Sequence, residues 1–231
     1  MRKILIIIPT LNEKGNISII LKKINKCQKQ ASVLFVDDNS KDGSVNEIKN
    51  YKKKNKNIFL LLRNDKKGVG SAHKDGLKWG YKKGFNYLCT LDCDGTHDPK
   101  DIKKMLKIID SCDLVNTNRF LNKKALTNWK LSRIILTKLR YFLVKIFLKT
   151  NLDSSGGFRL YDRRKINLND ILSAKDNHYN FFWESLFLLE KKYSIKEIPI
   201  VLPKRSLGKS KMKIKDVLYG FFYLIRVFLK N

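Results

Sequence analysis

The sequence predicts an α/β fold in which a mostly parallel central sheet is flanked by helices. Short β-rich apolar runs alternate with longer helical patterns through the first half of the chain, as in consecutive βαβ units. Each run is followed by polar or glycine-bearing residues. The length of 231 residues suits one well-packed α/β domain, alone or with an appended helical piece, and it leaves little room for two independent domains.

Five apolar runs are the expected strands, at residues 3–8, 32–36, 58–62, 87–91 and 113–116. Pro9 is expected to end the first strand, and a helix should begin near Gly15 or Asn16. Further helices are expected up to about Gly84 and from Pro99 onward. Because ligands of open α/β sheets bind beyond the carboxyl ends of the strands, the residues after each run should form the functional site.

Two later stretches, residues 129–149 and 217–229, combine apolar helical patterns with basic residues, and residues 179–191 form another helical stretch. None has the roughly 18 uncharged residues of a membrane-spanning helix. Two interpretations of the basic stretches stay open. They are core or dimer packing, and interfacial helices whose apolar faces enter the headgroup region while Lys and Arg meet lipid phosphates.

The composition indicates a folded protein with an acidic partner. The chain is 43% hydrophobic and 11% aromatic, and its formal net charge is +28. Such a charge must oppose nucleic acid, anionic lipid or a phosphorylated substrate. The four cysteines (Cys27, Cys89, Cys93, Cys112) show neither disulfide nor metal-ligand spacing, and no cleavable signal precedes them, so a reduced cytosolic compartment is expected.

Three segments follow the first three expected strands. Residues 9–13 (PTLNE) connect the first strand to a helix, and residues 37–44 (DDNSKDGS) form an acidic turn. The carboxylates of this turn could accept hydrogen bonds from a base or a ribose hydroxyl, as an acid at a strand end does in dinucleotide-binding folds. Alternatively, they could have only a structural role as a helix cap and turn. Residues 67–72 (KGVGSA) lack the third glycine of a dinucleotide fingerprint, and we expect their backbone to approach a ligand.

The strongest local signal is residues 88–99 (LCTLDCDGTHDP), where a buried strand ends in Asp92 and Asp94. While the strand persists, alternation points both carboxylates to one side. Two hard oxygen ligands at this place suit Mg²⁺ or Mn²⁺ bridging to substrate phosphates. A zinc site built on Cys93 and His97 is disfavoured because a second ligand pair is missing.

With these segments assembled, the chain resembles the family 2 glycosyltransferases of the GT-A fold, in particular the dolichol- or polyprenol-phosphate mannosyltransferases. The resemblance rests on eight segments in order: IIIPTLNE, VDDNSKDGS, GVGSAHKDGL, LDCDGTHDP, TNRF, DSSGGFRLY, EIPI and RSLGKSKM. It implies a Rossmann-like nucleotide-diphospho-sugar transferase domain over residues 1–212, with a helical insert at about 127–150. Residues 213–231 would form a C-terminal amphipathic interfacial helix.

The resemblance also implies roles for individual residues. The residues that would bind the nucleotide-sugar are Pro9, Leu11, Glu13, Val36, Asp38, Asp92, Asp94, Arg205 and Lys211. Asp92 and Asp94 would also bind the metal, and the acceptor phosphate would be bound by Arg119, Arg133 and Ser155. The implied catalytic residues are Asp94, Arg119 and Arg133. Arg205, Ser210 and Lys211 would lie on a mobile loop that closes over the diphosphate. Leu11 stands where the family commonly has Tyr, and Gly156 where it has Ser or Thr.

The expected activity is inverting transfer of a hexose, mannose from GDP-mannose, to a polyprenyl phosphate by a peripheral protein on the cytoplasmic face of a membrane. Glu184 and Asp153 are reserve candidates for a base, and His97 is expected to be a turn residue. One alternative is a family 2 enzyme that uses UDP-glucose or another nucleotide-sugar. Nucleic-acid binding is a remote alternative, since the sequence shows no recognisable nucleic-acid-binding motif beside its positive charge. A partner membrane protein or a dimer is also compatible with the two apolar stretches.

Overall fold

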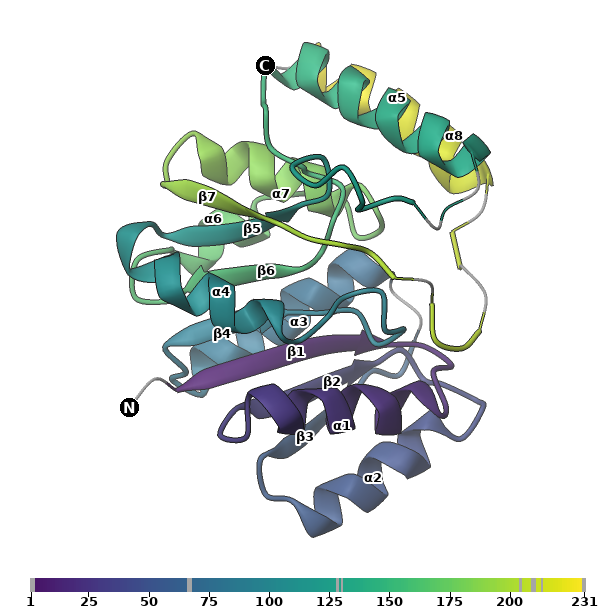
Figure 1. Cartoon of the computed structure of the whole chain (residues 1–231), viewed down its shortest axis with the longest axis vertical. Helices are drawn as coiled ribbons and strands as arrows, with labels where there is room; N and C mark the ends of the chain where they lie inside the picture. Colours follow the sequence, from purple (N-terminus) through teal and green to yellow (C-terminus); the bar gives the residue numbers. More distant parts are fainter. Residues whose placement is uncertain are drawn as a thin grey trace.

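The computed structural model describes residues 3–65, 68–127, 129, 131–203, 205–208, 211–212 and 214–229. Its centre is a seven-stranded mixed sheet of order β3-β2-β1-β4-β6-β5-β7 (Figure 1). The strands are β1 (Ile4–Thr10), β2 (Ser32–Asp37), β3 (Ile58–Leu62), β4 (Tyr87–Thr90), β5 (Leu114–Asn118), β6 (Arg159–Asp162) and β7 (Ile195–Pro199). The first four are parallel, β6 is antiparallel to β4 and β5, and β7 is parallel to β5.

Helices cover both faces of this sheet. They are α1 (Asn16–Cys27), α2 (Ser44–Lys54), α3 (Val69–Lys82), α4 (Asp101–Ile108), the short 3₁₀ helix η1 (Ile109–Ser111), α5 (Leu131–Leu148), α6 (Leu168–Leu172), α7 (Phe181–Glu190) and α8 (Ile214–Phe228). One apolar core joins the sheet to α1, α2 and α4, and a second joins it to α3, α6 and α7. The uninterrupted run of residues 4–8 follows from this two-sided burial, since both faces of a parallel strand are covered.

The first strand is longer than the sequence analysis predicts, because Pro9 lies within β1 and pairs in register with Val36. Thr10 turns its carbonyl toward β2, where it accepts from Asp38 N, so Pro9 faces the other side. On that side the ladder to β4 ends at Ile7. A proline without an N–H donor is tolerated there because no partner strand continues.

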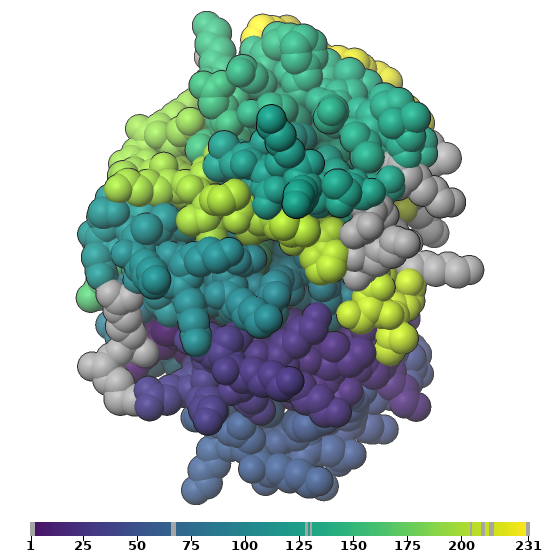
Figure 2. Space-filling view, viewed as in Figure 1, coloured from purple at the N-terminus to yellow at the C-terminus, as the bar shows by residue number. Residues whose placement is uncertain are grey.

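The two basic apolar stretches form α5 and α8, which lie side by side at one end of the molecule (Figure 1, Figure 2). Val144, Leu148 and Leu224 pack with Trp183 and Phe187 in a third, small core. Much of the remaining apolar surface of the two helices is exposed: Leu131, Ile135, Leu136, Leu139, Phe142, Ile146, Val217, Leu218, Phe221, Phe222 and Phe228. Among the described helices, none is long and apolar enough to cross a membrane.

Candidate active site

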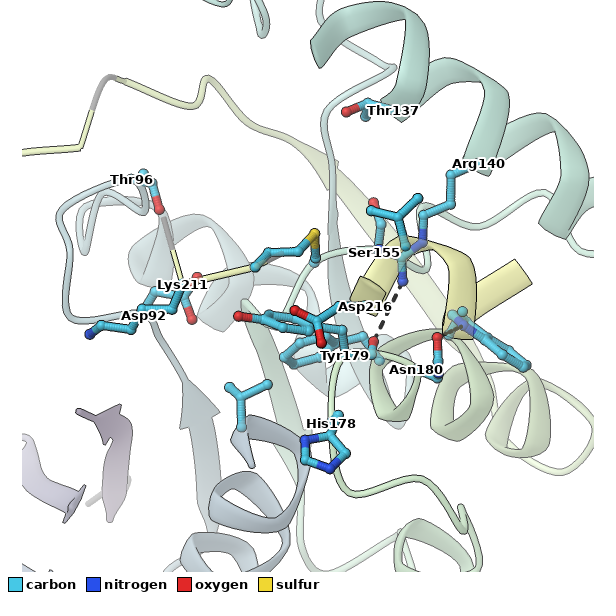
Figure 3. Close-up of a pocket in the computed structure, with 18 of the residues that line it drawn as sticks. Asp92, Thr96, Thr137, Arg140, Ser155, His178, Tyr179, Asn180, Lys211 and Asp216 are labelled. Carbon is cyan, nitrogen blue, oxygen red and sulfur yellow. Dashed lines mark hydrogen bonds between the residues drawn. The ribbon is translucent and has the colours of Figure 1, made fainter. Parts of the chain in front are cut away.

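A cavity of about 1230 Å³ lies at the carboxyl ends of β1, β2 and β4. Its wall continues over the start of α3, the segment before α7, and one face of each of α5 and α8. Figure 3 shows side chains from these separate elements facing the same space. The position agrees with the rule that open α/β sheets bind ligands beyond the carboxyl ends of their strands.

Most of the residues that the resemblance implies for the site line this cavity. They are Pro9, Leu11, Glu13, Asp38, Asp92, Asp94, Arg119, Arg133, Ser155, Arg205 and Lys211. Val36 does not line it, because its side chain is fully buried in the core against α3. A nucleotide can therefore not contact the Val36 side chain. Ser210 lies outside the described residues.

The two motif carboxylates are placed by a turn rather than by a strand. β4 ends at Thr90, so strand alternation does not reach Asp92 or Asp94, contrary to the sequence-based argument. Asp94 Oδ1 instead accepts hydrogen bonds from the Thr96 amide at 2.9 Å and the Thr96 hydroxyl at 2.6 Å. The turn fixes one carboxylate oxygen, and the other lies 2.7 Å from Arg205 Nη2.

The two carboxylates have opposite pKa shifts. Burial raises the pKa of Asp92, an effect that His97 partly offsets and the charge of Asp94 reinforces. Burial alone would also raise the pKa of Asp94, but the hydrogen bonds from Thr96 and the charge of Arg205 lower it below the usual value. His97 is buried, and its Nδ1 accepts from the Asp92 amide at 3.2 Å, which agrees with the predicted role in the turn.

The last part of the loop before α8 lies across these carboxylates. Arg205 Nη2 is 2.7 Å from Asp94 Oδ2, and Lys211 forms an ion pair with Glu13 and donates to the Leu11 carbonyl. Glu13 is further held by Asn16 Nδ2 at 2.6 Å. The chain thus brings two cations from beyond residue 200 to the residues that follow β1 and β4.

Asp38 is paired with Arg63, a residue that the sequence analysis did not single out. The buried Arg63 guanidinium forms an ion pair with Asp38 and donates to Ser71 Oγ at 2.8 Å and to the Gly68 carbonyl at 3.1 Å. Burial raises the pKa of Asp38, and Arg63 opposes that shift. Arg63 therefore connects the acidic turn after β2 to the glycine turn before α3. Its position directly after β3, at the carboxyl end of a strand, is the sequence feature that could have indicated a role in the site.

On the other side of the cavity, Arg119 is held by Asp153. Both the Arg119 amide and its Nε donate to Asp153 Oδ2, at 2.9 and 2.7 Å. Asp153 is fully buried, and although burial opposes the shift, Arg119 lowers its pKa. Gly156 gives this guanidinium its room, since a Cβ there would lie 3.0 Å from Arg119 Nη2.

Both reserve candidates for a base are engaged in structural contacts. The carboxylate of Asp153 binds Arg119 and also accepts from Ser155 Oγ at 2.8 Å. Glu184 is buried, where it accepts from the Asp176 amide at 2.9 Å and from the Tyr223 hydroxyl at 3.1 Å. Glu184 thereby attaches α8 to α7, and it does not line the cavity.

Two arginines reach the cavity from α5. The Arg133 guanidinium lies 3.6 Å from the centre of the Trp129 ring, a cation–π arrangement. Arg140, which was not predicted, lies two turns further along the same helix and lines the same cavity. Burial lowers the pKa of Arg140 to about 10, and the nearby charge of Arg119 adds to the shift. The seven-residue spacing could have indicated their common face.

The residues at the carboxylate end fit a hard divalent cation. Asp92 and Asp94 supply oxygen donors, the type that Mg²⁺ and Mn²⁺ prefer. In the described part of the chain, no group of three or more His, Cys, Asp or Glu side chains is placed to hold a metal. A metal held by Asp92 and Asp94 would take further oxygen ligands, such as phosphates.

Solved structures with a similar fold support the GT-A architecture. The glucosyl-3-phosphoglycerate synthase of M. tuberculosis matches with a TM-score of 0.65 and 16% identity, covering 99% of this chain and 80% of that one. S. aureus TarS in complex with UDP-GlcNAc matches with a TM-score of 0.61 and 17% identity, covering 98% and 65%. At these identities the likeness confirms the predicted fold and nothing finer.

Sequence relatives align over nearly the whole chain. A polyprenol monophosphomannose synthase of Mycolicibacterium smegmatis is 28% identical in an alignment 230 residues long, which covers 96% of this chain and 85% of the relative. An undecaprenyl-phosphate mannosyltransferase of Micrococcus luteus is 30% identical over 212 residues, 91% and 87% of the two chains. The family model "Glycosyl transferase family 2" matches residues 5–168, a span that includes β1 to β6 and both motif carboxylates. This chain therefore belongs to glycosyl transferase family 2.

Proposed function

We propose that this protein transfers mannose from GDP-mannose to the phosphate of a polyprenyl phosphate, with inversion at the anomeric carbon. One observation carries the proposal: a single cavity joins the carboxylates Asp92 and Asp94 to the guanidinium groups of Arg119 and Arg133. It thus offers one place for a diphosphate with its metal and another for a second phosphate. The names of the two sequence relatives, both polyprenyl-phosphate mannose enzymes, support the same substrates.

The donor would occupy the end of the cavity that lies at the carboxyl ends of β1, β2 and β4. Pro9, Leu11 and Asp38 line that end, and Asp38, paired with Arg63, would accept a hydrogen bond from a base or a ribose hydroxyl. Arg205 and Lys211 would meet the donor phosphates, and their contacts with Asp94 and Glu13 at this end of the cavity support that role. Their charges would oppose the negative charge that grows on the departing diphosphate.

Asp92 and Asp94 would hold Mg²⁺ or Mn²⁺ together with the donor phosphates. The bound ion would stabilise the negative charge of the leaving group and orient it. Thr96 would keep the Asp94 carboxylate in place through its two hydrogen bonds.

The acceptor phosphate would lie against Arg119, Arg133 and Ser155. Its oxygen would attack the anomeric carbon while the bond from that carbon to the diphosphate oxygen breaks, so nucleoside diphosphate leaves and a phosphodiester forms. A phosphate monoester has a second pKa near 6 and is already anionic at neutral pH. No side-chain base is needed, which agrees with the structural engagement of Asp153 and Glu184. Binding and orientation would supply most of the rate enhancement.

The apolar surface of α5 and α8 would rest on an anionic membrane at its cytoplasmic face. Leu136 and Leu139 on α5, and Leu218 and Phe221 on α8, are exposed and also line the cavity. A polyprenyl chain could therefore leave the phosphate site along apolar side chains. Interfacial helices combine exposed apolar side chains with positive charge, and this chain has both, since its net charge is +28.

The division of the chain into a transferase domain at residues 1–212 and a C-terminal helix at residues 213–231 stays a prediction.

A family 2 enzyme that uses UDP-glucose for another lipid-linked or surface glycan is the alternative. It would keep the same fold and carboxylates and would change the base contacts and the product. The arginines Arg119 and Arg133, which a sugar-hydroxyl acceptor would not require, favour the phosphate acceptor.

A donor and acceptor screen tests the proposal. Purified protein is incubated with a polyprenyl phosphate, Mg²⁺ or Mn²⁺, and radiolabelled GDP-mannose or UDP-glucose, and lipid-linked label is extracted. We expect a mannosyl phospholipid product with GDP-mannose and little with UDP-glucose. Label transferred only from UDP-glucose would support the alternative, and the absence of lipid product with every donor would contradict the proposed reaction.

A further inference from the structure

Arg140 lies inside the cavity, and the reaction described above gives it no task. It extends from α5 toward the segment before α7, where it donates to the Tyr179 carbonyl (Figure 3). That contact is 3.5 Å long, at the outer limit of a hydrogen bond, and therefore weak. A guanidinium has five N–H donors, and the hydrogen bonds to residues that the structure describes engage one of them.

The charges around Arg140 are not balanced. Burial and the charge of Arg119 lower the pKa of both Arg133 and Arg140, so the Arg119 guanidinium is close enough to act on each of the other two. Asp153 is the carboxylate paired with Arg119. Neither Arg133 nor Arg140 forms an ion pair with a carboxylate in the described residues. Three positive charges and one negative charge leave this arginine cluster (Arg119, Arg133, Arg140 with Asp153) with a net charge of about +2.

A net charge of this size matches one specific form of phosphate. A phosphate monoester carries close to two negative charges above its second pKa of about 6, whereas a phosphodiester carries one. In the proposed reaction the acceptor is a monoester and the product is a diester. A site of charge +2 would therefore hold the substrate more tightly than the product.

We propose that Arg140 is a third phosphate-binding guanidinium, which makes the acceptor site selective for a phosphate monoester over a phosphodiester. This inference rests on the proposed function and extends it to the discrimination between substrate and product. Arg133 and Arg140 approach the phosphate from one face of α5, while Arg119, oriented by Asp153, approaches from the end of β5. After transfer, the loss of one negative charge weakens the hold of the cluster and favours product release.

The test measures binding of two short ligands, farnesyl phosphate and its methyl diester, by isothermal titration calorimetry at pH 7.5. The variants are Arg140→Gln and Arg140→Lys. Lys138→Gln serves as the matched control, since it removes one positive charge from an exposed position of the same helix that does not line the cavity. Short prenyl chains keep vesicles and detergent out of the measurement.

We expect wild-type protein to bind the monoester at least about tenfold more tightly than the diester. Arg140→Gln should weaken monoester binding by about tenfold or more, the usual scale of a hydrogen bond to a charged group, and diester binding by less than about threefold. Arg140→Lys should keep part of the selectivity with weaker binding, because it retains the charge and loses the planar donor geometry. Lys138→Gln should bind as the wild type does.

Unchanged monoester binding in Arg140→Gln, or an equal loss for both ligands, would overturn the inference and leave the proposed function standing. Wild-type protein that binds neither ligand and transfers no sugar would instead contradict the proposed function. Thermal unfolding of each variant is measured first. If Arg140→Gln does not fold, Arg140→Lys decides, because wild-type affinity for both ligands in that variant would show that the guanidinium has no part in phosphate binding.

Discussion

Single side chains at this site are positioned by partners that are distant in sequence. Asp94 belongs to a short motif that the sequence reveals, but its second oxygen faces Arg205 from a loop more than a hundred residues later. Arg63 and Arg140 were not predicted, because their partners Asp38 and the Tyr179 carbonyl come from other elements. A motif thus identifies a residue type at a strand end, whereas its pairing depends on tertiary contacts.

The first residue-scale prediction concerns the metal. Asp94→Asn keeps an oxygen that can accept from Thr96 and removes the negative charge, so divalent-cation binding should weaken. Because a bound metal supplies several kcal/mol of charge stabilisation, we expect at least about a 100-fold loss of transfer activity. The measurement is the transfer rate as a function of Mn²⁺ concentration.

Asp98→Asn is the matched control for that prediction. Asp98 lies four residues further along the same turn, does not line the large cavity, and accepts from the Lys100 amide at 3.0 Å. An asparagine can accept the same bond, so activity should stay within about twofold of wild type. Full metal-dependent activity in Asp94→Asn would exclude Asp94 as a metal ligand.

The second residue-scale prediction concerns His73 and acid stability. His73 is buried beside Phe181 and Phe182, with ring centroids 6.0 and 5.1 Å away. Burial, with nearby Arg159, lowers its pKa from 6.5 to about 3. Between these values the unfolded chain binds a proton that the folded chain does not. Stability contributed by neutral His73 is therefore present above pH 6.5 and is lost as the pH falls.

His73→Gln, which cannot titrate, isolates this effect. We expect the wild-type free energy of unfolding, relative to that of His73→Gln, to decrease by roughly 2 to 3 kcal/mol between pH 7 and pH 4.5. Urea unfolding of both proteins at several pH values gives this difference, in which carboxylates common to both cancel. Parallel pH curves for the two proteins would mean that His73 accepts a proton in the folded state.

At the scale of elements, local patterns predict most of the fold and miss two strands. The five predicted strands correspond to β1 to β5, and the helices predicted at residues 129–149 and 179–191 correspond to α5 and α7 within two residues at each end. β6 has four residues and β7 has five, with exposed Lys196 and Pro199 in the latter. Such short segments become strands through pairing with β4 and β5, which a sequence pattern does not encode.

The exposed faces of α5 and α8 give the element-scale prediction. Phe142 and Phe222 are 56% and 66% exposed, so replacing both with serine should change the folding free energy little. Burial of one phenylalanine contributes about 1.5–3 kcal/mol, and we expect the double variant to bind anionic vesicles at least about tenfold more weakly. Vesicle sedimentation measures this. Leu62→Ser, at an exposed position of β3, is the control for loss of surface apolarity.

Size-exclusion chromatography of the same proteins tests the other interpretation of these helices, in which their apolar faces form a dimer interface. A dimer that dissociates in the Phe142→Ser, Phe222→Ser variant, with vesicle binding unchanged, would identify the apolar faces as a subunit interface. A monomer at every concentration would leave the membrane surface as their proposed partner.

At the scale of the whole molecule, the fold collects two kinds of chemistry around one cavity. The family 2 core supplies strand ends with Glu13, Asp38, Asp92 and Asp94, while α5 and α8 add basic and apolar residues at the rim. Three of these four acids pair with a cation: Asp38 with Arg63, Asp94 with Arg205 and Glu13 with Lys211. The net charge of +28 therefore acts mainly at longer range, as a general attraction for polyanionic surfaces.

This separation of long-range and local charge predicts different responses to salt. The Debye length falls from about 10 Å at 0.1 M salt to about 3 Å at 1 M, so attraction of the whole chain to an anionic vesicle should be screened. A phosphate bound as proposed inside the cavity would meet its arginines at contact distance and would be screened less. Between 0.05 and 0.5 M NaCl we expect vesicle binding to weaken by about tenfold or more and farnesyl phosphate binding by less than about threefold. Sedimentation with anionic and zwitterionic vesicles and calorimetry with the soluble ligand measure the two effects.

Salt-independent binding to anionic vesicles would contradict this prediction, because it would mean that apolar insertion alone holds the protein at the surface. Binding to DNA would also be salt-sensitive, so salt-sensitive DNA binding does not demonstrate a nucleic-acid function.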